Sequence, residues 1–230
     1  MSVQERLDSI HERVRSAAKS VGRTPDEIRL IAVSKRQPFE RLEEAYRLGL
    51  RDFGENTAQG LAARVGECDA AGLRGIRWHF VGRLQRNKVR TVGPICHRIH
   101  SLDRLPLAEA LARRATEQKS DVLIQVNLGQ EEQKGGIAIA DLKDFASELR
   151  RMPGLRIRGL MGMPPIGIEP APYYRQLGQL FGGLGKEMQP EVFTELSMGM
   201  SGDFETAIRY GATHVRVGTA IFGERPARSE

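Results

Sequence analysis

Short apolar runs and longer amphipathic stretches alternate along the whole chain. The short runs have the length of strands and are rich in branched residues, whereas the longer stretches repeat apolar positions at helical spacing. Eight segments have the strand pattern: Arg29–Lys35, Asp52–Asn56, Trp78–Gly82, Arg98–Asp103, Asp121–Leu128, Arg156–Met163, Glu195–Met200 and Val215–Phe222. The apolar run within 121–128 is nearly continuous, which is typical of a parallel strand buried on both faces. The pattern therefore predicts repeated strand–helix units and a parallel sheet.

Helical stretches lie before the first strand and between the others. The first has apolar residues at helical spacing from Val3 to Val21, and a second begins at Pro38, a favourable first residue. The clearest of the rest are Leu105–Gln118, Ile139–Met152, Pro172–Met188 and Asp203–Tyr210. Eight such units in 230 residues predict a single domain over residues 1–230, an α/β fold of the closed (β/α)8 TIM-barrel type. A doubly wound open sheet is the alternative.

The chain ends soon after the eighth predicted strand. Only the tail Gly223–Glu230 follows it, so the last outer helix of a regular barrel is expected to be missing. We expect the amphipathic N-terminal helix to cover that gap.

Composition and charge narrow the class of protein. Hydrophobic residues make up 40% and charged residues 28%, as in soluble globular proteins, and no apolar run could span a membrane. The first residues are too charged for a secretion signal, and Cys68 and Cys96 have no metal-ligand spacing. We therefore expect a cytoplasmic protein without a metal. The net charge of +6 is spread along the chain, and the densest basic segment, Arg83–Arg90, lacks aromatic residues for stacking on bases. A solvated basic face is favoured over a nucleic-acid partner.

Polar residues stand at the C-terminal ends of the predicted strands, where barrels of this type carry their active sites. Lys35 ends the apolar run that begins at Leu30. A lysine held against apolar walls loses hydration of its ammonium form, so its pKa falls and it becomes a nucleophile toward an aldehyde. The alternative is a lysine that simply reaches solvent at a strand end.

A second signal follows the seventh and eighth strands. Ser201 and Gly202 precede a short helix, and Gly218 and Thr219 stand near the end of the last predicted strand. Phosphate sites recur at this place in barrels, because free backbone N–H groups at a helix start favour an anion and glycine lets it come close. The alternative is that Ser201 is an ordinary helix cap.

Other candidate residues lie within or beside the predicted strands. Arg216 needs a partner if it faces the barrel interior, and an aromatic ring nitrogen would serve; an outward or ion-paired arginine is the alternative. His79 interrupts an apolar strand, either as a hydrogen-bonded core histidine or as a ligand contact. Four methionines fill the core or form a flexible apolar wall: Met161, Met163, Met198 and Met200.

Five stretches together resemble one known family. They are Ala32–Lys35, Phe53–Asn56, Trp78–Lys88, Ser197–Asp203 and Val215–Gly223. With these motifs, in the same order and over nearly the whole chain, the sequence resembles the pyridoxal-phosphate homeostasis proteins, also called the YggS or proline-synthase co-transcribed family. That family looks like the barrel domain of alanine racemase and other fold-type III enzymes. One departure is Thr57, where relatives commonly have tyrosine, and it affects only a peripheral contact.

The resemblance implies pyridoxal 5′-phosphate as the cofactor and a role for each matching residue. Lys35 would carry the cofactor as a Schiff base. Ser201, with the backbone of Gly218 and Thr219, would hold the phosphate. Arg216 would face the pyridine nitrogen.

The same resemblance implies that Asn56 and His79 line the face of the cofactor or its ring substituents. It also implies a carrier that buffers or delivers pyridoxal phosphate in the cell, and so affects amino-acid and keto-acid metabolism. An arginine does not readily protonate the ring nitrogen, and we expect no C-terminal β-domain of the kind that accompanies the racemases. We therefore expect no catalytic residues, a monomer, and pyridoxal-phosphate-dependent apo-enzymes as partners.

Two enzyme hypotheses stay open beside the carrier. One is a pyridoxal-phosphate-dependent amino-acid racemase or a related fold-type III enzyme. The other is a Schiff-base aldolase without a cofactor, which predicts a colourless protein.

Overall fold

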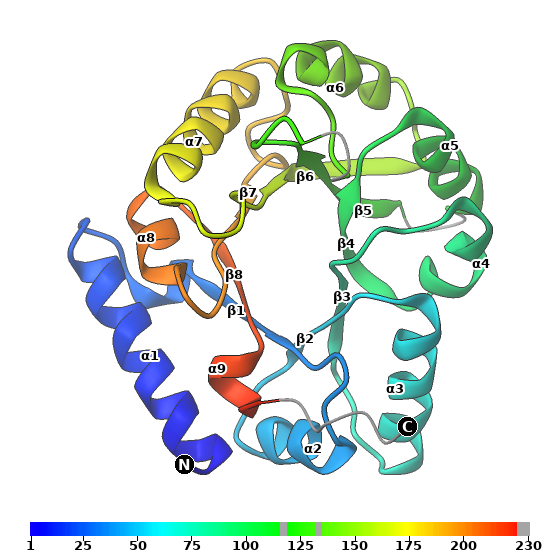
Figure 1. Ribbon diagram of the computed structural model, residues 1–230. Coiled ribbons are helices and arrows are strands. Elements are labelled where there is room, and N and C mark those ends of the chain that lie inside the picture. The colour runs from blue at the N-terminus through cyan, green and yellow to red at the C-terminus, as the bar shows by residue number, and fades with distance from the viewer. Residues whose placement is uncertain (116–118, 132–134, 225–230) are drawn as a thin grey trace.

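Eight parallel strands form a closed barrel in the computed structural model, which describes residues 1–115, 119–131 and 135–224. The strands pair in chain order, and β8 closes the barrel against β1 (Figure 1). They are β1 (Arg29–Val33), β2 (Asp52–Glu55), β3 (Arg77–Phe80), β4 (Cys96–Leu102), β5 (Ser120–Val126), β6 (Leu155–Gly162), β7 (Glu195–Ser197) and β8 (His214–Val217). Each lies within a residue of the start predicted for it, or two for β4. The (β/α)8 barrel is therefore confirmed, and the open sheet is excluded.

Helices surround the barrel on its outside (Figure 1). They are α1 (Val3–Lys19), α2 (Phe39–Arg47), α3 (Ala58–Ala70), α4 (Val89–Val92), α5 (Leu105–Arg114), α6 (Leu142–Arg150), α7 (Ala171–Gly185), α8 (Phe204–Arg209) and α9 (Thr219–Phe222). The end of the stretch predicted as 105–118 falls partly outside the described residues. Short 3-10 turns occupy Pro25–Glu27, Arg86–Lys88 and Ile139–Asp141. Among the described residues, no helix is both long and apolar enough to cross a membrane.

The eighth strand is shorter than the sequence predicts. It ends at Val217, and the apolar residues after Gly218 form the one-turn helix α9. The backbone nitrogens of Ile221 and Phe222 each donate to the Gly218 carbonyl oxygen at 2.9 Å. A short apolar run has the same pattern in a buried strand and in a buried helix, which explains the error. A single turn of helix thus stands where no helix was expected.

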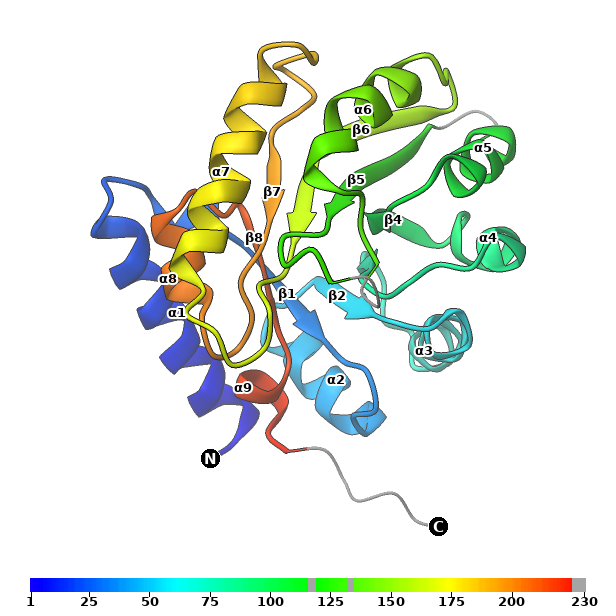
Figure 2. The same ribbon diagram turned by 45° about the horizontal axis from the view of Figure 1, so that its top comes forward.

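Helix α1 covers the gap beside the last strand, as predicted. Its buried face, which includes Leu7 and Ile10, packs beside α8 and α9 (Figures 1 and 2). Ser2 and Glu5 form a capping box at its start: the Glu5 backbone nitrogen donates to Ser2 Oγ at 3.1 Å, and the Ser2 nitrogen donates to Glu5 Oε2 at 2.8 Å. The cap defines where the helix begins, and the helical spacing of its apolar residues defines the buried face.

Charged residues ring the N-terminal ends of the strands. Asp52 on β2 accepts from Arg77 Nε at 2.8 Å and from Arg29 Nη1 at 3.1 Å. Glu195 on β7 accepts from Arg98 Nη2 at 2.7 Å and from Arg158 Nε at 3.2 Å, and Asp121 on β5 pairs with the same Arg98. These ion pairs join different strands at that end of the barrel. In such folds this end contributes stability, and the opposite end carries the site.

Candidate functional site

A cavity of about 290 Å³ opens at the C-terminal end of the barrel. This volume is near the lower end of the range for small-molecule sites. The predicted site residues that line it are Lys35, Ser201, Arg216, Gly218 and Thr219. They come from segments far apart in the sequence, because the loops after β1, β7 and β8 meet at this end.

Lys35 lies in the turn that follows β1. The strand ends at Val33, and the Gln37 backbone nitrogen donates to the Ser34 carbonyl oxygen at 3.0 Å, which closes the turn. Val33, Val81 and Met163 contribute apolar surface to the same cavity. Lys35 therefore enters a partly apolar pocket, as the sequence predicts.

A buried carboxylate, Glu55 at the end of β2, also lies near this turn. Ser34 Oγ donates to Glu55 Oε1 at 2.7 Å, and Glu55 is only 3% exposed. Burial raises the pKa of Glu55, while the Ser34 hydrogen bond and the charges of Arg64 and Lys35 act in the opposite direction. The surroundings of Lys35 thus combine apolar walls with an acidic group at the end of β2.

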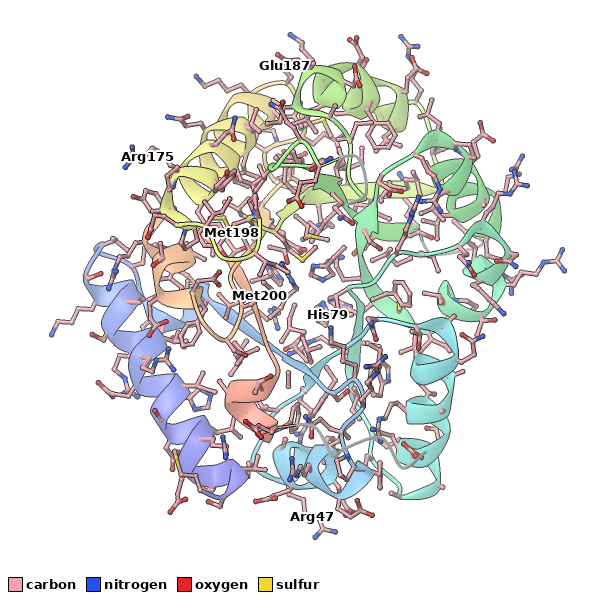
Figure 3. All side chains as sticks on the ribbon, in the orientation of Figure 1. Arg47, His79, Arg175, Glu187, Met198 and Met200 are labelled. Carbon is pink, nitrogen blue, oxygen red and sulfur yellow. The ribbon has the colours of Figure 1, made fainter. Side chains whose placement is uncertain are left out.

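The methionines divide between the two roles left open by the sequence. Met161 and Met198 are fully buried in the core. Met163 and Met200 line the cavity. Met198 and Met200 are labelled in Figure 3.

Ser201 joins two loops at the polar end of the cavity. Its Oγ accepts from the backbone nitrogens of Gly218 and Ala220, at 3.3 Å each. It does not cap α8, which begins at Phe204 and is preceded by Asp203. Ser201 is therefore not the cap of α8, and its oxygen accepts instead at the start of α9.

Gly218 is required where α9 begins. A Cβ atom at this position would lie 3.1 Å from the Val33 carbonyl oxygen, tighter than ordinary contacts. The absence of a side chain lets the start of α9 approach the end of β1.

Arg216 faces the interior of the barrel and is only 5% exposed. Its Nη1 donates to Ser197 Oγ at 2.6 Å, and its Nη2 donates to the Gly162 carbonyl oxygen at 3.3 Å. Burial lowers the pKa of Arg216 to about 10, while Tyr174 and Asp203 raise it. The side chain stays protonated at neutral pH, and the outward-facing alternative is excluded.

His79 lies outside the cavity lining, and its expected contact with a ligand stays a prediction. Its side chain is fully buried inside the barrel (Figure 3). Its Nδ1 lies 2.9 Å from His100 Nε2, and its Nε2 lies 2.9 Å from Asp52 Oδ1. Both ring nitrogens therefore have protein partners, as in the core-histidine alternative.

Asn56 also lies outside the cavity lining. It follows β2 and is partly buried. Its backbone packs tightly against Gly82, where a Cβ atom would lie 2.0 Å from the Asn56 carbonyl oxygen. The geometry gives Asn56 a clear backbone role, and a side-chain contact with a ligand stays a prediction.

Two residues of the site were missed by sequence reasoning. Gln37 lines the cavity and is 5% exposed, and its Oε1 accepts from Arg41 Nη1 at 3.1 Å. Its position two residues after Lys35 was the available signal. Ser197 holds Arg216, and only the packing of β7 beside β8 reveals that contact.

Other candidate features lie apart from this cavity. A larger hollow of about 1000 Å³ lies at the N-terminal end of the barrel, among the ion pairs of Asp52 and Glu195. Among the described residues, no group of three or more His, Cys, Asp or Glu could hold a metal ion. Cys68 and Cys96 are unpaired, and burial raises their thiol pKa values to about 11 and about 12. Neither thiol is an activated nucleophile.

Curated relatives match the chain over nearly its whole length. The family model described as alanine racemase, N-terminal domain, matches residues 6–226. A pyridoxal phosphate homeostasis protein from Escherichia coli K12 is 40% identical over 228 residues, which cover 97% of this chain and 97% of that protein. A protein of the same name from Aquifex aeolicus is 40% identical over 230 residues, covering 98% and 99%.

Solved structures agree with these matches. PipY from Synechococcus elongatus, solved with pyridoxal phosphate bound, has 36% identity and a TM-score of 0.83, covering 96% of this chain and 100% of that chain. Alanine racemase from Corynebacterium glutamicum has 18% identity and a TM-score of 0.64, covering 97% of this chain and 63% of that chain, and this likeness shows the fold alone. The resemblance seen in the five sequence stretches is confirmed: the chain belongs to the pyridoxal phosphate homeostasis protein family, whose barrel is that of the alanine racemase N-terminal domain.

Proposed function

We propose that this chain binds pyridoxal 5′-phosphate in the C-terminal cavity and serves as a carrier that buffers or delivers it in the cytoplasm. The observation that carries the proposal is the convergence of Lys35, Arg216, Ser201 and the start of α9 on one cavity. The relatives named for pyridoxal phosphate homeostasis and the PipY structure with the cofactor support the same ligand.

The chemistry of the lining fits the chemistry of this molecule. Pyridoxal phosphate supplies an electrophilic aldehyde carbon on an electron-withdrawing ring. The Lys35 amine is the group that would hold the aldehyde carbon. The Ser201 hydroxyl, whose O–H can donate while its oxygen accepts, and the backbone at Gly218 and Thr219 would hold the phosphate, because a helix start favours an anion. The cavity is small enough to suit a single ring.

Arg216 would donate an N–H to the pyridine nitrogen without transferring the proton. Its pKa of about 10 lies well above neutral pH, and the guanidinium remains charged while it donates. The ring nitrogen then stays unprotonated, so the ring withdraws electrons less strongly than a protonated ring would. This arrangement favours holding the cofactor over carbanion chemistry.

The lining also lacks the groups that racemisation requires. Removal of a proton from one face and return to the other needs a second acid or base opposite the lysine. Among the described residues, the cavity lining contains no His, Cys, Tyr, Asp or Glu. A carrier role is therefore favoured over the racemase alternative. Transfer to apo-enzymes and a monomeric state are further parts of this proposal.

The experiment that tests the proposal is covalent labelling of the bound cofactor. Protein mixed with pyridoxal phosphate should absorb in the near-violet, and borohydride reduction followed by peptide mapping should place the label on Lys35. Lys35→Ala should fold normally and lose both the band and the label. Lys186→Ala, which changes an exposed lysine on the outer surface, is the matched control and should keep both. A reducible label that persists on the same peptide in Lys35→Ala would overturn the assignment.

A further inference from the structure

A chain of hydrogen bonds crosses the barrel interior from Arg216 to Asp52. Arg216 Nη1 donates to Ser197 Oγ at 2.6 Å, and Ser197 Oγ lies 2.9 Å from His100 Nδ1. His100 Nε2 lies 2.9 Å from His79 Nδ1, and His79 Nε2 lies 2.9 Å from Asp52 Oδ1. This series of hydrogen bonds therefore links the cavity with the ion pairs at the opposite end of the barrel.

Every member of this chain is buried. Ser197, His79 and His100 are fully buried, Arg216 is 5% exposed and Asp52 is 6% exposed. In such an interior a hydrogen bond is stronger than in water, and an unpaired polar group is costly. The geometry of each member is therefore tied to that of its neighbours.

The two ends fix the direction of every bond in the chain. Arg216 can only donate, because a guanidinium has no acceptor. Burial alone would raise the pKa of Asp52, but hydrogen bonds from Arg77 and His79 and the charge of Arg29 hold it well below the usual range. Asp52 is therefore ionised and can only accept.

The intermediate groups must then follow one pattern. His79 donates from Nε2 to Asp52, so its Nδ1 accepts from His100 Nε2. Since Nδ1 of His100 is then the acceptor, the hydroxyl of Ser197 donates to it. Burial lowers the pKa of both histidines, and a neutral imidazole has the one donor and the one acceptor that this pattern requires.

We infer that Ser197, His100, His79 and Asp52 are positioning residues that hold the Arg216 guanidinium in the orientation presented to the cavity. Within the described residues Arg216 forms no ion pair with a carboxylate, although Asp203 acts on it at longer range. The aligned dipoles of these hydrogen bonds end on the Asp52 carboxylate. They stabilise the buried positive charge of Arg216 in place of a direct carboxylate partner. The inference rests on the proposed function only in taking the ring nitrogen as the group that Arg216 meets.

The first test needs no cofactor. Nitrogen NMR of the protein at neutral pH should show His79 and His100 as neutral rings protonated at Nε2. Ser197→Ala should shift the resonances of His100 Nδ1 and of the Arg216 guanidinium, because both lose the hydroxyl. Ser101→Ala is the matched control: Ser101 follows His100, is 1% exposed, and its Oγ has no hydrogen-bond partner among the described residues. It should leave the Arg216 resonances in place. Unchanged Arg216 signals in Ser197→Ala, or protonation of His100 at Nδ1, would overturn the inference.

A second variant guards against local misfolding at Ser197. His79→Gln interrupts the chain without removing a group that contacts Arg216. It should also shift the guanidinium resonances, whereas Ser197→Thr keeps the hydroxyl and should restore them toward wild type. If the Arg216 resonances did not shift in His79→Gln, the hydrogen-bonded side chains would not act as a unit.

The second test uses the cofactor and a probe that lacks the ring nitrogen. Ser197→Ala should weaken pyridoxal 5′-phosphate binding about tenfold, and Ser197→Thr should restore it, since a positioned guanidinium contributes a charge-assisted hydrogen bond. The analogue with carbon in place of the ring nitrogen should bind the wild type and Ser197→Ala equally. Equal weakening of both ligands would mean a merely structural role and would overturn the inference. If neither the wild type nor any variant bound pyridoxal phosphate, the proposed function would be wrong. The NMR test would still decide whether these residues position Arg216.

Discussion

The Ser201 hydroxyl oxygen lies 3.3 Å from the backbone nitrogen of Gly218 and so joins the loop after β7 to the start of α9. The two residues are distant in sequence and meet only because β7 and β8 are neighbours in the barrel. This contact places a side-chain hydroxyl, which can still donate while its oxygen accepts, at a helix start. Such an arrangement is suited to a phosphate group.

Ser201→Ala should weaken binding of pyridoxal 5′-phosphate more than binding of pyridoxal. The substitution removes one hydrogen bond to a charged acceptor, worth about 1.5–3 kcal/mol, which is about ten- to a hundredfold in Kd. Titration of both ligands against wild type and variant measures the difference, with Ser101→Ala as a control of the same chemical change. Equal losses for the two ligands would place the phosphate elsewhere.

Asp52→Asn should lower the free energy of unfolding by about 3 kcal/mol. Asp52 is buried and accepts from Arg77, Arg29 and His79, and breaking a buried ion pair costs about 3–5 kcal/mol. The lower end of that range applies because both arginine side chains reach solvent, at 41% and 43% exposure. Chemical denaturation checks the value.

Asp69→Asn is the matched control for this substitution. Asp69 pairs with Arg74 at 2.6 Å, but both side chains are mostly exposed, at 63% and 68%. An exposed pair contributes about 0–1 kcal/mol. Similar losses at positions 52 and 69 would contradict the idea that the buried charges stabilise this end of the barrel.

Stability should fall as the pH drops below about 6.5. Burial lowers the pKa values of His79, His100 and His214 in the folded chain, so the unfolded chain takes up protons first. The stability that these three histidines contribute is therefore fully present above the unfolded pKa of about 6.5. Below that pH, each of them lowers the free energy of unfolding by about 1.4 kcal/mol per pH unit. Glu195 acts with the opposite sign, because burial raises its pKa and the folded chain takes up that proton first. Denaturation curves at several pH values measure the net slope.

His214→Gln should reduce this slope by up to about 1.4 kcal/mol per pH unit, which is the contribution of one proton. The side chain of His214 is buried, and its Nδ1 lies 2.9 Å from Thr213 Oγ1. His11→Gln changes an exposed histidine on α1 and should leave the slope as it is. A slope that His214→Gln does not alter would mean that the loss of stability has another source.

The barrel and most of the site could be predicted from the sequence because their signals are local. Each buried strand is a separate apolar run, and the rule that sites lie at the C-terminal strand ends brings Lys35 and Ser201 together. The helix α9 was missed because its apolar residues after Gly218 have the length and pattern of a strand continuation. No local signal separates the two conformations.

The interior polar contacts could not be predicted, because they depend on how the strands are staggered. Arg216 lies opposite Ile31 on β1, yet its side chain contacts Ser197 on β7. His79 was placed in the cavity on the basis of resemblance, whereas its partners are His100 and Asp52 on the strands to either side. Residue spacing along the chain does not contain this cross-strand geometry.

Bound pyridoxal phosphate should leave the α-hydrogen of amino acids in place. In the proposed complex Arg216 would not protonate the ring nitrogen, and the described cavity lining has no His, Cys, Tyr, Asp or Glu to act as a second base. Proton NMR in deuterated water would follow that hydrogen in alanine, serine and larger amino acids. The wash-out rate should equal that given by free pyridoxal phosphate at the same concentration. The free cofactor is the proper reference because its ring and aldehyde are the same and only protein contacts differ. An enhancement of ~10³, about 4 kcal/mol of barrier, would reveal a positioned base and would replace the carrier with a fold-type III enzyme.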